Sequence, residues 1–355
     1  MEDHTLRVDK GFYSGYVVIP ATISDGDITW TVTGINEKVF TNAITAISWE
    51  IETEIPSTAF ETINPNMLLY VRQKSLAPKE VQNVVVNGYA DKILLVDAER
   101  GNDFYCPVEF RANEISYTHS YTMTSGLGEC RGWETICLPL DVQNFFYEAK
   151  TLSPFGAYFE GSPHLPFWLC KLTSTGFEET AQLKANCPYL ISMPNNDYYL
   201  ESYNIKGEVM FASKNVKVHL TEPVIDTYRN YSLVACFNTK EIADNIYPIN
   251  AQNAYSTNTV YFAEGSVFIA SLRTVHPFEA YITTMDASAK IIPILESMTT
   301  AIQEIPFKED VMTVVKVYNL QGQLVKSERT TIEKALKGLA QGVYIVNGHK
   351  MYIGR

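Results

Sequence analysis

The carboxylates of this chain are its strongest candidates for chemistry, although no catalytic motif surrounds them. A glycoside hydrolase needs two carboxyl groups that flank the sugar bond. Glu134, Asp141, Glu178 and Glu179 are the residues that could supply such a pair. The same residue types also occupy ordinary outward positions on alternating strands. We expect the second arrangement, and we assign no catalytic residue.

Histidines and cofactor motifs give no stronger signal. The chain contains no G-x-S-x-G, H-E-x-x-H, P-loop or calcium-loop pattern. A zinc site needs three or four converging ligands, whereas the six histidines are scattered, at positions 4, 119, 164, 219, 276 and 349. The sequence therefore predicts a protein that is not an enzyme and that uses no cofactor or metal. It does not identify the residues that bind a ligand.

Cysteines and aromatic residues have two possible roles each. The six cysteines lie at positions 106, 130, 137, 170, 187 and 236, and none forms a C-x-x-C pair. Buried free thiols are the favoured interpretation, and one or two disulfides are the alternative. Rings stand beside polar groups at 166–168 and 196–203. They could stack on a sugar, but cross-strand core packing is the commoner use of aromatics in β-proteins.

Net charge and apolar patterning narrow the possible partners. The formal charge is −12 and the pI is near 5.0, and no basic cluster is present, so nucleic acid is excluded as a partner. An anionic membrane surface is disfavoured for the same reason. No apolar run reaches the roughly 18–20 residues of a membrane-spanning helix. The chain opens with Met1-Glu2-Asp3-His4, which is not a signal peptide.

The elements that must position these residues are mostly strands. Short runs rich in Val, Ile, Thr and aromatic residues recur through 108–295, separated by Gly, Pro and Asn turns. This pattern is typical of a β-sandwich or barrel. Asn87-Gly88 lies between two apolar runs and indicates a hairpin turn. Charged and turn-forming residues at 97–107 mark a domain boundary, and a second boundary is expected near 297–310.

A short repeat occupies residues 16–71. Thr33, Ile35 and Phe40 recur 20 residues later as Thr53, Ile55 and Phe60, and a strand-like stretch follows each copy. A period near 20 is typical of a solenoid. We expect Ile35, Phe40, Ile55 and Phe60 to stack in one apolar column.

This repeat resembles the BspA-like leucine-rich repeat of bacterial surface proteins. The resemblance rests on Val-Thr-Gly-Ile-x-x-x-x-Phe at 32–40, the Ile-rich strand after it, and Ile-x-x-x-Ala-Phe at 55–60. In that family the solenoid mediates adhesion to host proteins or to other cells. Residues 132–142 and 186–194 look like an uncharacterised domain that follows such repeats in gut-bacterial surface proteins. That second likeness implies architecture and no activity.

The C-terminal stretch is similar to the sorting domain of type IX secretion. The likeness rests on Val-Tyr-x-Leu-x-Gly-x-x-Val at 317–325 and Gly-Val-Tyr-Ile-Val at 342–346. An ordinary immunoglobulin-like end domain is the alternative. We expect Gly322 and Gly348 in hairpin turns, and Tyr344 and Val346 on a closing strand.

Together these patterns predict a mainly β chain with a short leucine-rich-repeat-like solenoid followed by antiparallel β-sandwich domains. The expected division is a BspA-like repeat region at 1–103, a β-sandwich domain at 104–298 and a sorting-like β domain at 299–355. The resemblances imply an exported cell-surface protein whose signal peptide has been removed, and which binds a host or bacterial surface protein or a glycan. A glycan-binding module of a polysaccharide-uptake system is the alternative, and a glycan hydrolase is the third. A cytosolic scaffold would fit the same composition.

Overall fold

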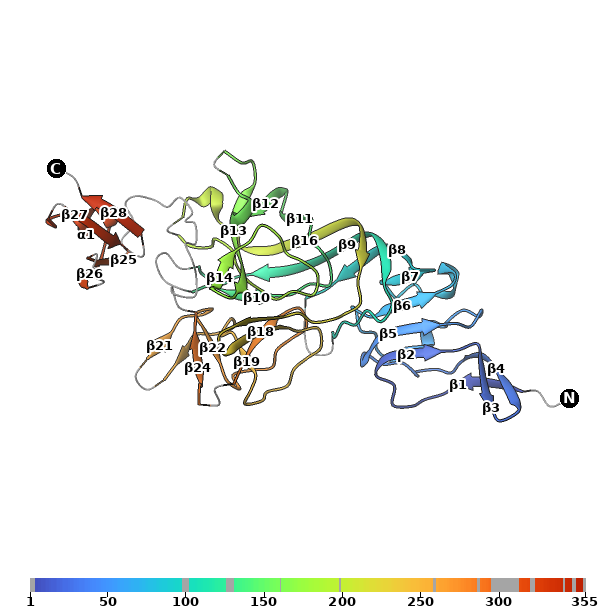
Figure 1. Cartoon of the computed structure of the whole chain (residues 1–355). Coiled ribbons are helices and arrows are strands. Elements are labelled where there is room, and N and C mark those ends of the chain that lie inside the picture. Colours follow the sequence, from blue (N-terminus) through green and yellow to red (C-terminus); the bar gives the residue numbers. More distant parts are fainter. Residues whose placement is uncertain are drawn as a thin grey trace.

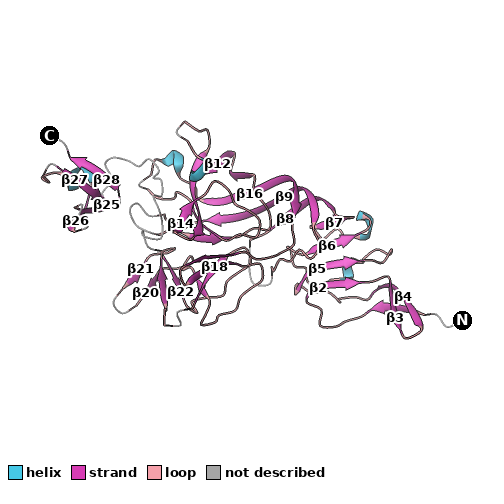
Figure 2. Cartoon of the chain, in the orientation of Figure 1, coloured by secondary structure: helices cyan, strands magenta, loops and turns pink. Residues whose placement is uncertain are grey.

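The chain is mainly β, as the composition predicted. The computed structural model describes residues 4–97, 102–125, 131–159, 161–197, 199–257, 260–285, 288–294, 313–319, 323–340, 342–346 and 349–353. Strands account for 47% of the structure and helices for 5%, so sheets must provide almost all of the packing surfaces (Figure 2).

The N-terminal part stacks parallel strands one above another. A three-stranded sheet comes first, with the order β1 (Thr5–Val8), β4 (Ile28–Ile35) and β3 (Thr22–Asp25). Beside it runs a parallel ladder of β2 (Gly15–Ile19), β5 (Ile44–Trp49), β6 (Leu68–Val71) and β7 (Val84–Val86). Two short 3₁₀ turns, η1 (Ser57–Ala59) and η2 (Lys74–Leu76), lie in the connections.

Hydrogen bonds between residues 20 positions apart join neighbouring turns of this ladder. The Asn42 amide donates to Thr62 Oγ1 at 2.9 Å and the Thr53 hydroxyl to the Thr33 carbonyl at 3.5 Å, both across a spacing of 20. The rings of Phe40 and Phe60 lie 5.3 Å apart. The ladder therefore has the offset of the sequence repeat, while its assignment as a leucine-rich-repeat solenoid stays a prediction.

The expected apolar column is largely present in the core of the ladder. Ile35, Phe40 and Ile55 are buried and belong to one apolar cluster. Phe60 is half-buried and packs against that cluster from its side. The repeat thus fixes three core positions, and the fourth lies at the edge of the core.

Asn87 and Gly88 form the expected tight turn, but the hairpin ends at once. Both residues have positive φ, +48° and +79°, and β7 pairs antiparallel with β8 (Tyr89–Leu95) only at Val86 and Tyr89. Beyond the turn β8 pairs instead in parallel with β9 (Phe110–Tyr121). Strand pairing therefore continues across the expected boundary at 97–107, so the N-terminal ladder and the middle region share one 13-stranded sheet (Figure 1).

The middle region continues this sheet and curls it back on itself. From β9 the strand order is β16, β11, β12, β13, β15 and β10, with β14 paired to β13. A hydrogen bond from His119 on β9 to Glu134 on β10 links the two ends of that order. The bounds are β10 (Glu134–Ile136), β11 (Asn144–Tyr147), β12 (Lys150–Pro154), β13 (Leu165–Thr173), β14 (Gly176–Glu179), β15 (Tyr189–Ser192) and β16 (Gly207–Val218), with 3₁₀ turns η3 (Phe155–Ala157) and η4 (Glu201–Tyr203).

A second layer covers the outer face of β13 and β15. A four-stranded sheet has the order β17, β18, β23 and β19, and two-stranded sheets β20–β21 and β22–β24 lie beside it (Figure 1). Trp168 and Leu190 from the first layer share an apolar cluster with Leu233 and Ile282 from the second. The bounds are β17 (Ile225–Tyr228), β18 (Tyr231–Ala235), β19 (Tyr247–Pro248), β20 (Tyr255–Ser256), β21 (Tyr261–Phe262), β22 (Val267–Ile269), β23 (Ala280–Thr284) and β24 (Ile291–Pro293).

The C-terminal unit has its own sheet and its own small core. The strand order is β26 (Leu324–Thr330), β25 (Thr313–Tyr318), β27 (Gly342–Val346) and β28 (His349–Ile353), with α1 (Ile332–Leu336) beside it. Tyr344 and Val346 lie on β27, an inner strand paired on both sides. Gly322, Gly348 and the expected boundary at 297–310 lie outside the described residues.

Two smaller expectations also have structural outcomes. Cys106, Cys137, Cys170 and Cys236 are buried free thiols, and Cys187 is a half-buried one; Cys130 lies outside the described residues. Within the part of the chain that the structure describes, no helix is long and apolar enough to cross a membrane.

Candidate functional site

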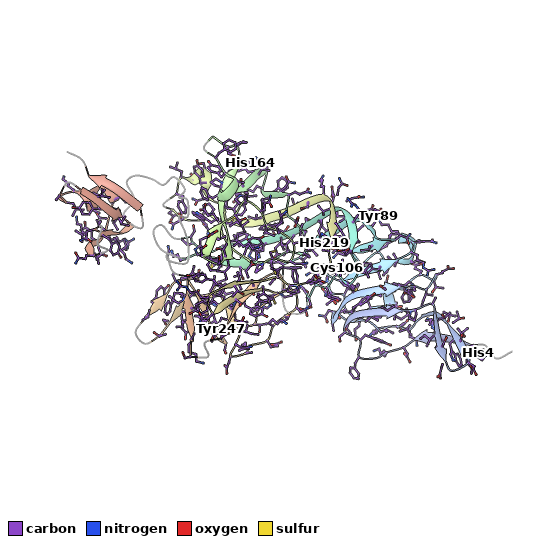
Figure 3. All side chains as sticks on the ribbon, viewed as in Figure 1. His4, Tyr89, Cys106, His164, His219 and Tyr247 are labelled. Atoms are coloured by element: carbon purple, nitrogen blue, oxygen red, sulfur yellow. The ribbon has the colours of Figure 1, made fainter. Side chains whose placement is uncertain are left out.

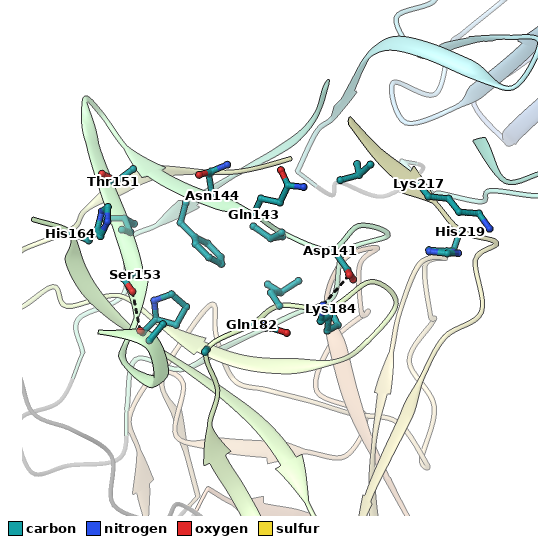
Figure 4. Close-up of a pocket in the computed structure, with 18 residues that line it drawn as sticks. Asp141, Gln143, Asn144, Thr151, Ser153, His164, Gln182, Lys184, Lys217 and His219 are labelled. Carbon is teal, nitrogen blue, oxygen red and sulfur yellow. Dashed lines mark hydrogen bonds and ion pairs between the residues drawn. The ribbon is translucent and has the colours of Figure 1, made fainter. Parts of the chain in front are cut away.

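An open groove of about 730 Å³, with polar side chains along its walls, lies between the β11–β12 hairpin and the loop at 181–184. Figure 4 shows its walls, with His164 at one end and Lys217 and His219 at the other. A volume of this size is typical of ligand sites in proteins. The polar residues that line it are Asp141, Gln143, Asn144, Thr151, Ser153, His164, Gln182, Lys184, Lys217 and His219.

A tight hairpin of β11 and β12 forms one wall of the groove. β11 and β12 pair antiparallel, Tyr147 opposite Lys150, and Glu148 takes the positive φ of +52° that the turn requires. Alternation along β11 buries Phe145 in the core and leaves Asn144 exposed. The groove thus receives an amide side chain from a strand that the apolar core holds in register.

Asp141 fixes the opposite wall. Its carboxylate accepts from the Ala185 amide at 2.8 Å and from Lys184 Nζ at 3.1 Å. Although partial burial raises the pKa of Asp141, these two donors outweigh it and hold the pKa below its ordinary value. The loop that carries Gln182 and Lys184 is therefore tied to the strand side by a charged contact.

The remaining charges of the groove are paired as well. Glu109, just outside the groove, contacts Lys217 Nζ at 2.7 Å and His219 Nδ1 at 2.9 Å. Hydrogen bonds to Lys217 and His219 lower the pKa of Glu109. With Lys184 on Asp141, each lysine of the groove has an acidic partner. The groove therefore presents hydrogen-bonding groups without a strong excess of either charge.

Several polar groups of the groove have no hydrogen-bond partner among the described residues. They include the side chains of Asn144, Thr151 and Gln182, which line the groove. The Nδ1 atom of His164 is buried without a partner. An unpaired buried nitrogen costs free energy that a bound donor or acceptor would recover. Amide, hydroxyl and imidazole groups of this kind suit a ligand rich in hydroxyls or peptide groups.

The four carboxylates that the sequence nominated do not converge on one place. Asp141 lines the groove, whereas Glu134 lines a different cavity and accepts a hydrogen bond from His119. Glu178 and Glu179 lie on β14, where Glu178 accepts from the Thr175 hydroxyl. Among the described residues that line the groove, Asp141 is the one carboxylate. Retaining and inverting hydrolases both require two.

The aromatic side chains that the sequence nominated, at 166–168 and 196–203, are not among the described residues that line the groove. Phe167, Trp168 and Tyr199 are buried, and Trp168 packs with its ring 6.1 Å from Tyr199. Tyr203 is half-buried against the same apolar cluster. These rings therefore pack in or against the apolar core, which is the interpretation that the sequence favoured. Tyr198 lies outside the described residues.

The histidines are spread through the molecule, and one of them has partners that sequence reasoning missed. His4, His164 and His219 lie well apart (Figure 3), and among the described residues no group of three or more His, Cys, Asp or Glu is placed to hold a metal ion. His119, however, contacts Asp97 at 2.7 Å and Glu134 at 2.8 Å. Burial lowers its pKa, but the hydrogen bonds and charges of the two carboxylates raise it to about 10.

Comparisons with known proteins leave the family of the chain open. Searches against protein-family models, against curated proteins and against solved structures find no match.

Proposed function

We propose that this chain is an exported cell-surface protein that binds a protein or a glycan and catalyses no reaction. The open polar groove carries the proposal. Its lysines are paired, and Asp141, the one carboxylate among its described lining residues, is committed to Lys184 and Ala185. Asn144, Thr151 and Gln182 remain for a ligand. A neutral, hydroxyl-rich glycan fits this set of groups better than a charged ligand does.

The repeat supports the surface role independently of the groove. We interpret residues 16–75 as a BspA-like leucine-rich repeat on the basis of the sequence resemblance, and the hydrogen bonds at a spacing of 20 agree with that interpretation. The resemblance of 299–355 to a type IX sorting domain suggests how such a protein would reach the surface. Its four-stranded sheet is compatible with that role.

A polysaccharide-uptake module remains a second candidate because its ligand would be of the same chemistry. Binding in such a module would also use the neutral groove, although the buried positions of Trp168 and Tyr199 argue against stacking platforms made from these rings. A hydrolase is disfavoured because the described groove residues include a single carboxylate.

An array of glycans and matrix proteins, probed with the purified chain, tests the proposal. We expect the intact chain to bind at least one glycan or protein on the array. The double variant Asn144→Ala with Gln182→Ala should reduce that signal by about ten-fold, the effect of losing one or two good hydrogen bonds. Asn253→Ala, a change of an exposed amide outside the groove, should leave it unchanged. An array without signal, or equal signal from the groove variant, contradicts the proposal.

The compartment needs a separate test. The full-length gene is expressed in its native host, and protease is added to intact cells. We expect the protein to be degraded before lysis. If it survives until the cells are lysed, the surface role is wrong, and an intracellular interaction role becomes the better interpretation.

A further inference from the structure

A second cavity, of about 410 Å³, lies where the ends of the curled sheet meet loops of the second layer. Strands β9 and β10 contribute His119, Tyr121 and Glu134, and the loops contribute Gln252 and Glu264. None of these side chains takes part in the groove. The cavity falls in the volume range of small-ligand sites.

The described residues that line this cavity carry more negative than positive charge. Asp97, Glu134, Glu264 and Glu279 are its acidic side chains. His119 lies between Asp97 and Glu134 and balances one of these charges. Arg273 pairs with Glu279 at 2.8 Å and balances another. The described residues of this lining therefore keep a net negative charge, which attracts a cation and repels an anion.

Some of the oxygen atoms around the cavity are already committed, and others are not. Asp97 uses both of its oxygens, accepting from His119 and from the Tyr117 hydroxyl at 2.8 Å. Glu134 accepts from His119 with Oε2 alone, so Oε1 has no hydrogen bond among the described residues. The Glu264 and Gln252 side chains likewise line the cavity with no such partner there. These side-chain oxygen atoms can therefore accept hydrogen bonds from a ligand.

Tyr121 gives an independent indication that something belongs in this cavity. Its side chain is 3% exposed, and its hydroxyl is buried without a hydrogen-bond partner. The ring packs edge-on against His119 at 4.6 Å, which places it beside the carboxylates. Burial raises the pKa of Tyr121, and the charges of Glu134 and Asp97 raise it further. A buried hydroxyl at a cavity wall normally has a partner.

We propose that this cavity binds an organic ammonium group, with Glu264, Glu134 Oε1 and the Tyr121 hydroxyl as its acceptors. An ammonium offers three donors and one positive charge, which suits three of these uncommitted groups and the net negative charge of the described lining. Hydrogen bonds between an ammonium and a carboxylate are among the stronger ones in proteins. A metal ion fits less well, because the described residues contain no cluster placed to hold one. The ammonium comes from a free small amine or from a lysine side chain of a protein.

Calorimetric titration of the full chain with 1,5-diaminopentane tests the proposal. The neutral analogue 1,5-pentanediol and the anionic analogue glutarate are the chemical controls. Glu264→Gln removes one acceptor charge with almost no change in shape, and Tyr121→Phe removes the unpartnered oxygen alone. Glu222→Gln makes the same charge change at an exposed position that lines neither cavity. Melting temperatures confirm that each variant is folded.

We expect the diamine to bind and both analogues to fail. Glu264→Gln should raise the dissociation constant about ten-fold, the effect of one charge-assisted hydrogen bond. Tyr121→Phe should raise it several-fold without lowering the melting temperature. Glu222→Gln should bind as the parent does. No binding of the diamine, equal binding of the diol, or equal losses in Glu264→Gln and Glu222→Gln would overturn the proposal.

The source of the ammonium is resolved by a second titration with a blocked peptide that contains one lysine. Tighter binding of the diamine supports the proposal with a free amine as the ligand. Tighter binding of the peptide supports it with a lysine side chain of a partner protein. Titrations at two salt concentrations should show weaker binding at the higher one, since a charged contact near the surface is screened.

Discussion

Replacing His119 by glutamine is the sharpest test of how the curled sheet is closed. His119 lies on β9 and contacts Glu134 on β10 at 2.8 Å and Asp97, just beyond β8, at 2.7 Å. Its side chain is 23% exposed. Without the imidazolium, the two carboxylates face one another without the cation that balances them. Breaking a buried pair from one side typically costs about 3–5 kcal/mol. Because the Asp97 side chain is 48% exposed, solvent screening places this contact at the lower end of that range.

The pKa of His119 sets the upper limit of its contribution to stability and the direction in which that contribution changes with pH. The pKa of His119 rises from 6.5 to about 10 on folding, which corresponds to at most about 5 kcal/mol of stability. Because the folded pKa is raised, this contribution is fully present below pH 6.5 and is lost as the pH rises through about 10. We therefore expect His119→Gln to lower the free energy of unfolding by about 3 kcal/mol at pH 6 and to have little effect at about pH 10.5.

Urea unfolding, followed by tryptophan fluorescence at a series of pH values, measures this difference. The matched control is His219→Gln, since His219 also contacts a carboxylate, Glu109, at 2.9 Å, but on the surface with a side chain 52% exposed. An exposed pair of this kind contributes little, so the control should unfold as the parent does at every pH. A loss in His119→Gln that is the same at pH 6 and at pH 10.5 would refute the charged contact as its cause.

Two further predictions concern packing, both measured by urea unfolding. Phe40→Ala should lower the free energy of unfolding by about 3–5 kcal/mol because Phe40 is fully buried. Phe60→Ala should lower it clearly less because Phe60 is half-buried. Equal losses in the two variants, or negligible ones, would contradict the stacked core. Gly265→Ala should cost more than about 3 kcal/mol, since a Cβ there would lie 2.3 Å from the Trp133 nitrogen. Gly26→Ala, with positive φ but open space around it, should cost only about 1 kcal/mol.

The local features of the fold were predictable from the sequence. Turn chemistry at Asn87-Gly88 indicated a tight turn because asparagine and glycine tolerate positive φ, and both have it. The spacing of 20 between the repeat copies indicated which residues meet, and Phe40 does contact Phe60. These signals are local or periodic, so a single sequence is enough to read them.

The long-range pairings were not predictable by the same means. A tight turn was expected to give a hairpin, but β8 leaves β7 after one residue pair and joins β9 in parallel. Which strand becomes the partner is decided by tertiary packing, which overrides the local signal. The contact of His119 with Asp97 and Glu134 depends on the same pairing and on the curl of the sheet. One signal was available, since Tyr117, His119 and Tyr121 alternate on one strand and therefore share a face.

The groove was harder still to predict, because its residues come from separate elements. Asn144 is on β11, His164 precedes β13, and Gln182 lies in a loop after β14. None of them belongs to a motif, and each is an ordinary polar residue on its own. Only the folded sheet brings them to one surface, so the sequence predicted a binding protein but named no binding residue.

The continuous sheet also covers one end of the short N-terminal ladder. In stacked repeats each unit buries its apolar face only against its neighbours, so both ends need a cover. At the N-terminal end, Val32 and Ile35 of β4 join the same apolar cluster as Phe40. At the other end, β7 passes through β8 into β9, and Val85 of β7 belongs to the core of the middle region. The ladder is therefore covered at both ends by structure that is not itself repetitive.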